Sequence, residues 1–284
     1  MSHYTTAQVL CDKNEKKFGN CQLVHIDVVN EDGSNVPKPR GEWPNLRGFL
    51  ELQKDPTEWL NSTSIDMAIR AYHRTLPTNV RRTIHIVPTD LVGLFNRKRD
   101  VYERAKGGGY PRMFRAFSRT EYTVWPINIE NAHWELAFIR KERVEGTVLT
   151  GGFGPFRRIT QVAIMDSWNN ASNPRRKARI DRRMPNILSA YGFMFATSYK
   201  RNVSVPAQSD SHSCGPRVYW EAKQMMERVA FLVADGGYDE SLWNNMDDRW
   251  VNIDGVRWEM VGITAYEIIR QMDFQARVYR DDTI

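Results

Sequence analysis

The stretch Gln208-Ser-Asp-Ser-His-Ser-Cys214-Gly215 decides how the rest of this chain is interpreted. It ends in a cysteine that directly precedes a segment with helical periodicity, because apolar residues recur there every three or four positions. These residues are Val218, Ala222, Met225, Val229 and Leu232. Asp235-Gly236-Gly237 predicts the end of that helix. Cys214 is therefore expected at a helix N-terminus, where the helix dipole favours a thiolate over a thiol.

Two polar residues far upstream stand where a thiol nucleophile would need them. His133 begins a predicted strand over 133–140, and Asp166 ends another over 158–166. An imidazole within reach of a thiol can take its proton and later deliver it to a leaving amine. A carboxylate behind the imidazole fixes its tautomer and stabilises the imidazolium. The two residues are therefore candidates for a general base and its orienting acid.

The same stretch also offers groups for an oxyanion. The side-chain amide of Gln208 and the backbone N–H of Cys214 are donors of the kind that stabilise a tetrahedral intermediate. Gly215 has no Cβ, so the backbone there can approach a substrate closely. Each feature alone has an ordinary explanation, such as a core cysteine or a structural histidine. The complete set in this order is far more specific.

The ordered set resembles the ubiquitin-like-protein-specific cysteine proteases of the Ulp/SENP family, to which the adenovirus protease is a distant relative. The family pattern is Pro-Ile-Asn, His-Trp, Asp-Ser, and then Gln with five residues before Cys-Gly. The matching residues here are Pro126-Ile127-Asn128, His133-Trp134, Asp166-Ser167, Gln208 and Cys214-Gly215. Upstream, Trp59-Leu60-Asn61 is similar to the family's Trp-Leu-Asn signature. The resemblance covers about residues 46–233.

This resemblance implies a role for each matched position. Cys214 would be the nucleophile, His133 the general base and acid, Asp166 the residue that orients His133, and Gln208 part of the oxyanion hole. The implied fold is α+β, a papain-like or adenain-like cysteine protease with a central mixed β-sheet flanked by helices. The catalytic cysteine would stand at the N-terminus of one helix.

The resemblance also implies a substrate channel. Trp134 and Trp59 resemble the aromatic residues that cover a narrow passage for a Gly-Gly tail, although plain core packing remains an alternative for Trp59. Asn61 and Gly215 complete the expected substrate-binding set. Ser213 departs from the family, which often has Asp before the cysteine, and Ser62 stands where many members have Asp. These departures leave the identity of the modifier open.

Composition narrows the classes of protein. The chain has 284 residues, a net charge of +6 and only three cysteines, at 11, 21 and 214, so a disulfide framework is excluded. We expect a reducing compartment, nuclear or cytoplasmic. No apolar run reaches the roughly 20 residues of a membrane span. Cys11, Cys21 and His25 fit no standard zinc-ligand spacing, so we expect no metal or other cofactor. The protein is expected to be a monomer.

Three regions are predicted along the chain. Residues 1–45 form an N-terminal arm, 46–233 a cysteine protease domain, and 234–284 an acidic and helical extension packed on that domain. The stretch 144–156 is an expected insertion. Further predicted elements are helices at 61–75, 91–106, 174–191 and 263–272 and strands at 83–87, 122–129 and 195–205. A basic run at 175–183 is either a solvated helix face or a surface for an acidic modifier, and nucleic acid is not the expected partner.

The favoured function is a thiol protease or isopeptidase that cleaves after the C-terminal Gly-Gly of a ubiquitin-like modifier, alone or in its conjugates. SUMO is the first candidate modifier, and the reaction would pass through an acyl-enzyme. Two alternatives stay open: a same-clan acetyltransferase that uses the same residues, and a non-catalytic domain that binds a modifier.

Overall fold

The computed structural model describes residues 46–53, 57–89, 114, 116–129, 133–144, 156–168, 174–236, 239–246 and 250–281. The predicted arm at 1–45, the predicted helix at 91–106 and nearly all of the 144–156 insertion lie outside these ranges. So do the side chains at 174–179, 181 and 182, which carry most of the basic run.

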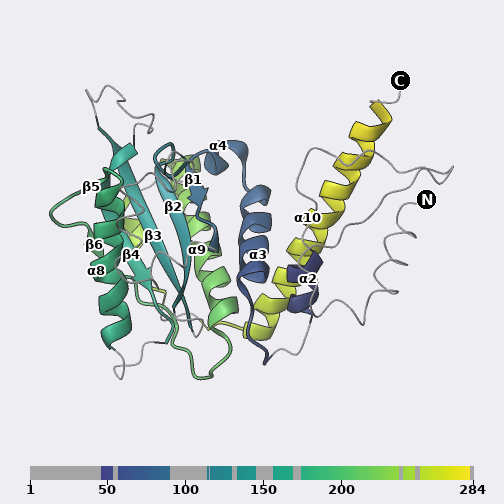
Figure 1. The fold of residues 1–284 in the computed structure, drawn as a ribbon, viewed down its shortest axis with the longest axis horizontal. Coiled ribbons are helices and arrows are strands. Elements are labelled where there is room, and N and C mark those ends of the chain that lie inside the picture. The colour runs from purple at the N-terminus through teal and green to yellow at the C-terminus, as the bar shows by residue number, and fades with distance from the viewer. Residues whose placement is uncertain are drawn as a thin grey trace.

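A six-stranded mixed sheet forms the centre of the molecule (Figure 1). Its strands are β1 (Ile84–Ile86), β2 (Tyr122–Ile129), β3 (His133–Arg143), β4 (Phe156–Met165), β5 (Met194–Phe195) and β6 (Lys200–Arg201). The order is β1-β2-β3-β4-β5, and β6 also pairs with β4. The pairs β2–β3 and β3–β4 are antiparallel. Strand β1 pairs with β2 in parallel, and β5 and β6 pair with β4 in parallel. The predicted α+β class with a mixed sheet is confirmed.

Helices cover both faces of this sheet (Figure 1). They are α2 (Leu46–Leu52), α3 (Ser62–Thr75), α4 (Thr78–Arg81), α8 (Pro174–Ala190), α9 (Cys214–Asp235) and α10 (Ile253–Asp281), with a 3-10 turn η3 (Asp239–Trp243). Alternating residues of β3 divide the core: Leu136 and Phe138 pack with α3, α9 and α10, whereas Ala137 and Ile139 pack with α8. The central strands are therefore buried from both sides.

Helix α9 has the apolar face that its periodicity predicts. All five of the periodic residues named above are buried. The helix ends at Gly236, whose left-handed φ of 61° closes the last turn through a bond from its N–H to the Leu232 carbonyl. Cys214 is the first residue of α9, as predicted.

Two elements differ from the sequence-based prediction. The strand expected at 195–205 is wrong, because only β5 and β6 pair with β4 there, over two residues each. The helix expected at 263–272 begins earlier, at Ile253, and runs to Asp281. Val256, Met260 and Ile268 form one buried stripe along this longer helix. None of the described helices has the length and apolarity to cross a membrane.

Residues beyond the predicted boundary at 233 share the main core. Trp243, Val256 and Met260 belong to the same buried cluster as Leu60 and Cys214. The division at 233 stays a prediction about domains, but the hydrophobic core is continuous across it.

Candidate active site

The register of the sheet brings His133 and Asp166 together. β2 and β3 form a hairpin in which Ile129 lies opposite His133, so this histidine stands at the end of the ladder. On the other side of β3, Leu136 lies opposite Met165, and Asp166 is the next residue of that strand's path. Because side chains alternate along a strand, His133 and Glu135 occupy equivalent positions on β3 close to Asp166.

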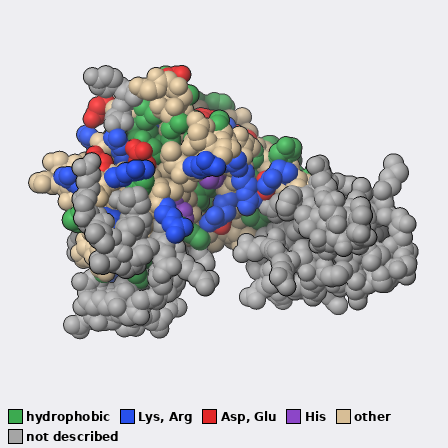
Figure 2. Space-filling view, turned by 90° about the horizontal axis from the view of Figure 1, so that it is seen from above, with side chains coloured by type: hydrophobic (Ala, Val, Ile, Leu, Met, Phe, Trp, Pro, Cys, Tyr) green, Lys and Arg blue, Asp and Glu red, His purple; other side chains and the backbone are tan. Residues whose placement is uncertain are grey.

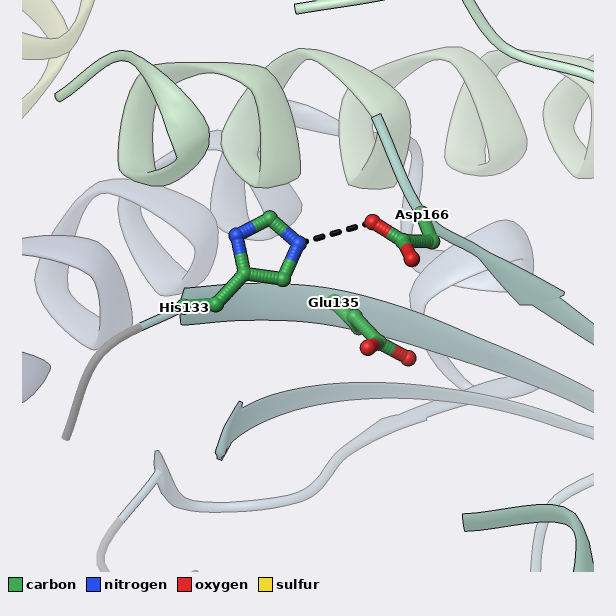
Figure 3. A group of neighbouring side chains, drawn as sticks. All are labelled: His133, Glu135 and Asp166. Carbon is green, nitrogen blue, oxygen red and sulfur yellow. Dashed lines mark hydrogen bonds and ion pairs between the residues drawn. The ribbon is translucent and has the colours of Figure 1, made fainter. Parts of the chain in front are cut away.

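The imidazole and the carboxylate form a short hydrogen bond. His133 Nε2 lies 2.7 Å from Asp166 Oδ1, with the His133 side chain only 1 % exposed (Figure 3). The same Oδ1 accepts a hydrogen bond of 2.9 Å from the backbone N–H of Trp168. The Trp168 ring also meets the imidazole edge to face, with 5.1 Å between centroids. These contacts fix the plane of the His133 ring.

The second ring nitrogen of His133 is left open. Nδ1 is buried and has no hydrogen-bond partner among the described residues. A buried polar atom without a partner is costly, and native structures rarely keep one without a reason. Since Nε2 is committed to Asp166, Nδ1 is the atom of this ring that can exchange a proton with another group.

The thiol of Cys214 lies near the start of β3. The backbone N–H of Trp134, the residue that follows His133, donates toward the sulfur, as do those of Cys214 and Gly215. Burial raises the pKa of the Cys214 thiol, and these three N–H groups oppose that effect. The N–H groups at the start of α9 therefore do not bring the pKa of this thiol below its usual value.

Gly215 has a packing role at this point. A Cβ added there would lie 3.1 Å from Leu60 Cβ and 3.2 Å from Ile65 Cδ1. The missing side chain thus lets the first turn of α9 rest against the start of α3. The close approach that the sequence predicted is made here to the protein's own side chains, and contact with a substrate stays a prediction.

Gln208 reaches the site through a loop and not through a strand. Its backbone N–H donates to the Ser167 carbonyl at 2.6 Å, and its Oε1 accepts from the Ser167 hydroxyl at 3.3 Å. Its Nε2, the donor that an oxyanion would need, is bonded to the Asp210 carbonyl at 2.7 Å and lies 3.3 Å from Asp210 Oδ1. The loop therefore ties the amide to Asp210.

Asp210 organises the loop, although the sequence analysis did not select it. Its Oδ1 accepts from the backbone N–H groups of His212, at 2.9 Å, and Ser213, at 2.6 Å. Partial burial acts to raise the pKa of this carboxyl, but the bonds from Ser213 and His212 outweigh it and lower the pKa. An Asp whose side chain accepts hydrogen bonds from backbone N–H groups two or three residues later is typical of an Asx turn. Only that weak local signal could have identified it.

A buried polar group also lies behind the site on α9. Arg217 donates to the Ser213 hydroxyl at 3.0 Å and to the Pro206 carbonyl at 3.1 Å, which anchors both ends of the loop. Glu221 is buried one turn further on. Desolvation raises its pKa well above the usual value, and the nearby charges of Asp166 and Glu135 add to this effect against that of Arg217.

The two predicted channel tryptophans are brought to neighbouring positions. Trp134 is 1 % exposed, and its indole N–H donates to the Leu60 carbonyl at 3.2 Å. Trp59, the residue before Leu60, is 40 % exposed. Asn61 caps helix α3, because its Oδ1 accepts from Ser64 N at 2.9 Å. Trp59 is thus the member of this set that is open to solvent, and Asn61 has a structural task of its own.

One group of side chains has the composition of a metal site. Ligand atoms of His133, Glu135 and Asp166 all lie within 4.8 Å of one another (Figure 3). A cation there would have to displace the proton shared by His133 and Asp166. The short bond between them favours a histidine–carboxylate pair over a set of metal ligands.

Basic side chains gather on a different face, which Figure 2 shows from above. Among the described residues, Arg70, Arg74 and Arg81 lie close to His73 on α3. Burial lowers the pKa of His73 to about 4, and the three arginines contribute. Arg70 and Arg74 are paired with Asp66 and Glu267, which reduces their net field. The predicted role of the run at 175–183 is untested, because most of its side chains lie outside the described part.

Comparison with known proteins places this chain in a family. Residues 58–251 match the C-terminal catalytic domain of the Ulp1 protease family. A search of curated proteins found no match. Among solved structures, a mutant of Xanthomonas XopD is similar with a TM-score of 0.51 and 17 % identity, covering 72 % of this chain and 99 % of the chain in that structure. The effector XopD of Xanthomonas campestris, bound to ubiquitin, is similar with a TM-score of 0.50 and 19 % identity, covering 83 % of this chain and 97 % of that one.

The structural likeness supports the shared fold, and the sequence match covers about two thirds of the chain, including His133, Asp166, Gln208 and Cys214. This chain therefore belongs to the Ulp1 protease family of cysteine proteases.

Proposed function

We propose that this protein is a thiol protease or isopeptidase that cleaves after the C-terminal Gly-Gly of a ubiquitin-like modifier, with SUMO as the first candidate. The observation that carries the proposal is the state of His133. One ring nitrogen is fixed on Asp166, and the other is buried and open beside the residues that surround Cys214. This arrangement is suited to acid–base work on a thiol.

The reaction follows from these positions. His133 Nδ1 takes the thiol proton as the Cys214 sulfur attacks the carbonyl carbon of the last glycine. Asp166 stabilises the imidazolium. The tetrahedral intermediate collapses, the C–N bond breaks, and the imidazolium gives its proton to the departing amine. A water molecule then attacks the acyl-enzyme, with His133 again as base, and releases the glycine carboxylate and the free thiol.

The oxyanion is the part of the reaction for which the site must rearrange. Gln208 Nε2 is the side-chain donor available, together with the backbone N–H of Cys214. In this structure that Nε2 is bonded to Asp210. We propose that substrate binding exchanges this internal bond for one to the oxyanion. Loss of one oxyanion donor costs about 10²–10³ in kcat in other enzymes.

The substrate proposal rests on Trp59 and Trp134 and on the family. A passage between two indoles admits residues without a Cβ more readily than others, which explains a preference for Gly-Gly. That XopD has been seen bound to ubiquitin supports a ubiquitin-like partner for this chain. The proposal includes a reducing compartment, nuclear or cytoplasmic, because the attacking group is a free thiol.

The test is a panel of ubiquitin-like modifiers, including SUMO and ubiquitin, each with an electrophile in place of its C-terminal carboxylate. A covalent adduct at Cys214 with at least one modifier, absent in Cys214→Ala, is the expected result. If no modifier forms an adduct, the proposal is wrong. Self-acetylation with labelled acetyl-CoA would then indicate the acetyltransferase alternative.

A further inference from the structure

An arginine of the C-terminal helix is buried against the segment that carries Trp59. Arg257, on α10, is only 5 % exposed. Its Nε donates to the Leu52 carbonyl at 3.1 Å, one Nη to the Glu58 carbonyl at 3.1 Å, and the other Nη to the Glu51 carbonyl at 3.4 Å. Burying a guanidinium is expensive unless its donors are matched, and here all three nitrogens find acceptors.

The three carbonyls belong to two different segments. Glu51 and Leu52 end helix α2, where carbonyls have no partner within the helix and the dipole attracts a cation. Glu58 directly precedes Trp59. Arg257 therefore joins the end of α2 to the start of the segment 58–60 and fixes the distance between them.

The segment 58–60 in turn touches the neighbours of both predicted catalytic residues. The Leu60 carbonyl accepts the indole N–H of Trp134, which follows His133. The Leu60 Cβ faces Gly215, which follows Cys214. A continuous series of contacts thus runs from α10 through Trp59 and Leu60 to the residues next to the nucleophile and the base.

We propose that Arg257 is a positioning residue that holds Trp59 and Leu60 as one wall of the glycine channel. This inference rests on the proposed function and adds the C-terminal helix to it. The family match ends at residue 251, before α10 begins at Ile253, so this part of the wall lies outside the matched region.

Directional bonding distinguishes this role from ordinary packing. Val256 and Met260 on α10 are already buried in the same cluster as Leu52 and Leu60, so apolar contact holds the helix in place. An arginine adds hydrogen bonds to three particular carbonyls, which define a position more narrowly than apolar contact does. A narrow channel depends on that precision. It can exclude alanine, which has one methyl group more than glycine, only if its walls are held in fixed positions.

The variants are Arg257→Met, which keeps the length of the side chain but removes every donor, and Arg257→Lys, which keeps one charged donor. The matched control is Arg228→Met. Arg228, on α9, also binds two backbone carbonyls, those of Leu242 at 3.0 Å and Asn244 at 2.6 Å, which belong to the stretch at and after η3 and not to the segment 58–60. The control reports what the loss of a carbonyl-binding arginine does by itself.

The first readout is amide hydrogen exchange in the full chain. We expect the amides of Trp59, Leu60 and Asn61 to exchange about tenfold faster in Arg257→Met than in the wild type, with a smaller change in Arg257→Lys and none in Arg228→Met. This measurement needs no activity. Equal protection of the segment in the wild type and Arg257→Met would overturn the proposal.

The second readout uses two matched substrates, a modifier ending in Gly-Gly and the same modifier ending in Ala-Gly. For Arg257→Met we expect KM for the Gly-Gly substrate to rise about tenfold, kcat to change less than about threefold, and the preference for glycine over alanine to fall. If Arg257→Met and Arg228→Met lose only thermal stability and keep both KM and the glycine preference, Arg257 has no positioning role. If Arg257→Met does not fold, the same comparison is made with Arg257→Lys.

The two proposals fail in different ways. Absence of an adduct between wild-type Cys214 and every modifier would refute the proposed function, while hydrogen exchange would still decide whether Arg257 holds the wall. An active wild type with an unaltered Arg257→Met would refute only this inference.

Discussion

The two halves of the candidate site are built in different ways. His133 and Asp166 stand at the ends of paired strands, and their 2.7 Å bond is already formed. Gln208 lies in a loop between β6 and α9, and its donor is bonded to Asp210 at 2.7 Å. For the roles proposed above, the difference means that the sheet preorganises the proposed acid–base pair, whereas the proposed oxyanion donor would have to change its hydrogen bonds when a substrate arrives.

The strand-built half should show the largest effect. We expect His133→Ala to lower kcat/KM by at least about 10⁴-fold, because His133 is the proposed base for the Cys214 thiol. Cleavage of a modifier with a C-terminal fluorophore measures it. The control is His73→Ala, which changes a half-buried histidine of α3 outside the site. Similar losses in both variants would point to a folding defect and contradict the assignment.

Asp166 tests whether the orienting bond matters. Asp166→Asn keeps the size of the side chain but removes the charge that stabilises the imidazolium, so we expect kcat to fall by about 10³-fold. Asp66→Asn is the matched control, since Asp66 is paired with Arg70 at 2.7 Å, outside the set of residues that forms the site. A loss of less than about fivefold in Asp166→Asn would show that His133 needs no carboxylate.

The loop-built half should show a smaller effect. We expect Gln208→Ala to lower kcat by about 10²-fold with KM nearly unchanged, because the amide acts on the oxyanion and not on the bound substrate. Gln224→Ala is the control, since that amide binds Glu227 on the exposed side of α9. An equal change of kcat and KM in Gln208→Ala would place the amide in substrate binding.

The smallest and most discriminating change is Asp210→Asn. An asparagine retains an oxygen for the backbone N–H groups of His212 and Ser213 but removes the charge that raises the pKa of the Cys214 thiol. The titratable or charged groups that face Asp210 are His212, whose Nδ1 lies 3.5 Å from Oδ1, and Arg217. Since a lower thiol pKa favours the thiolate, the acidic limb of the pH profile of kcat/KM should move to lower pH, with an activity gain of about threefold on that limb.

Asp235→Asn supplies the control for this charge change, because Asp235 is the last residue of α9, at the end opposite Cys214. It should leave the pH profile where it is. An Asp210→Asn profile that coincides with that of the wild type would show that the loop exerts no electrostatic restraint on the nucleophile.

The sequence carried enough local information for much of this arrangement. The start of α9 at Cys214 follows from a periodicity of apolar residues within the helix itself. His133 begins a stretch whose pattern predicts a strand, Asp166 follows the apolar stretch 162–165, and the family resemblance paired the two residues. Both kinds of signal lie within short stretches, which explains why they could be recognised.

The remainder depends on contacts that no short stretch encodes. Arg257 binds a carbonyl 205 residues away, at Leu52. Asp210 looks like any polar loop residue until its bonds to Ser213 and Gln208 are seen. The segment 195–205 has β-forming residues, but of this region only the short strands β5 and β6 pair with β4. Tertiary pairing decides each of these cases.

The central claim is that the open Nδ1 of His133 serves the thiol of Cys214. The most direct measurement is the rate of alkylation of Cys214 by iodoacetamide as a function of pH, in the wild type and in His133→Ala. Burial raises the pKa of this thiol, so without a base it should react only at alkaline pH. The account predicts rapid alkylation at neutral pH in the wild type and its loss in His133→Ala, whereas superimposable curves for the two proteins would contradict it.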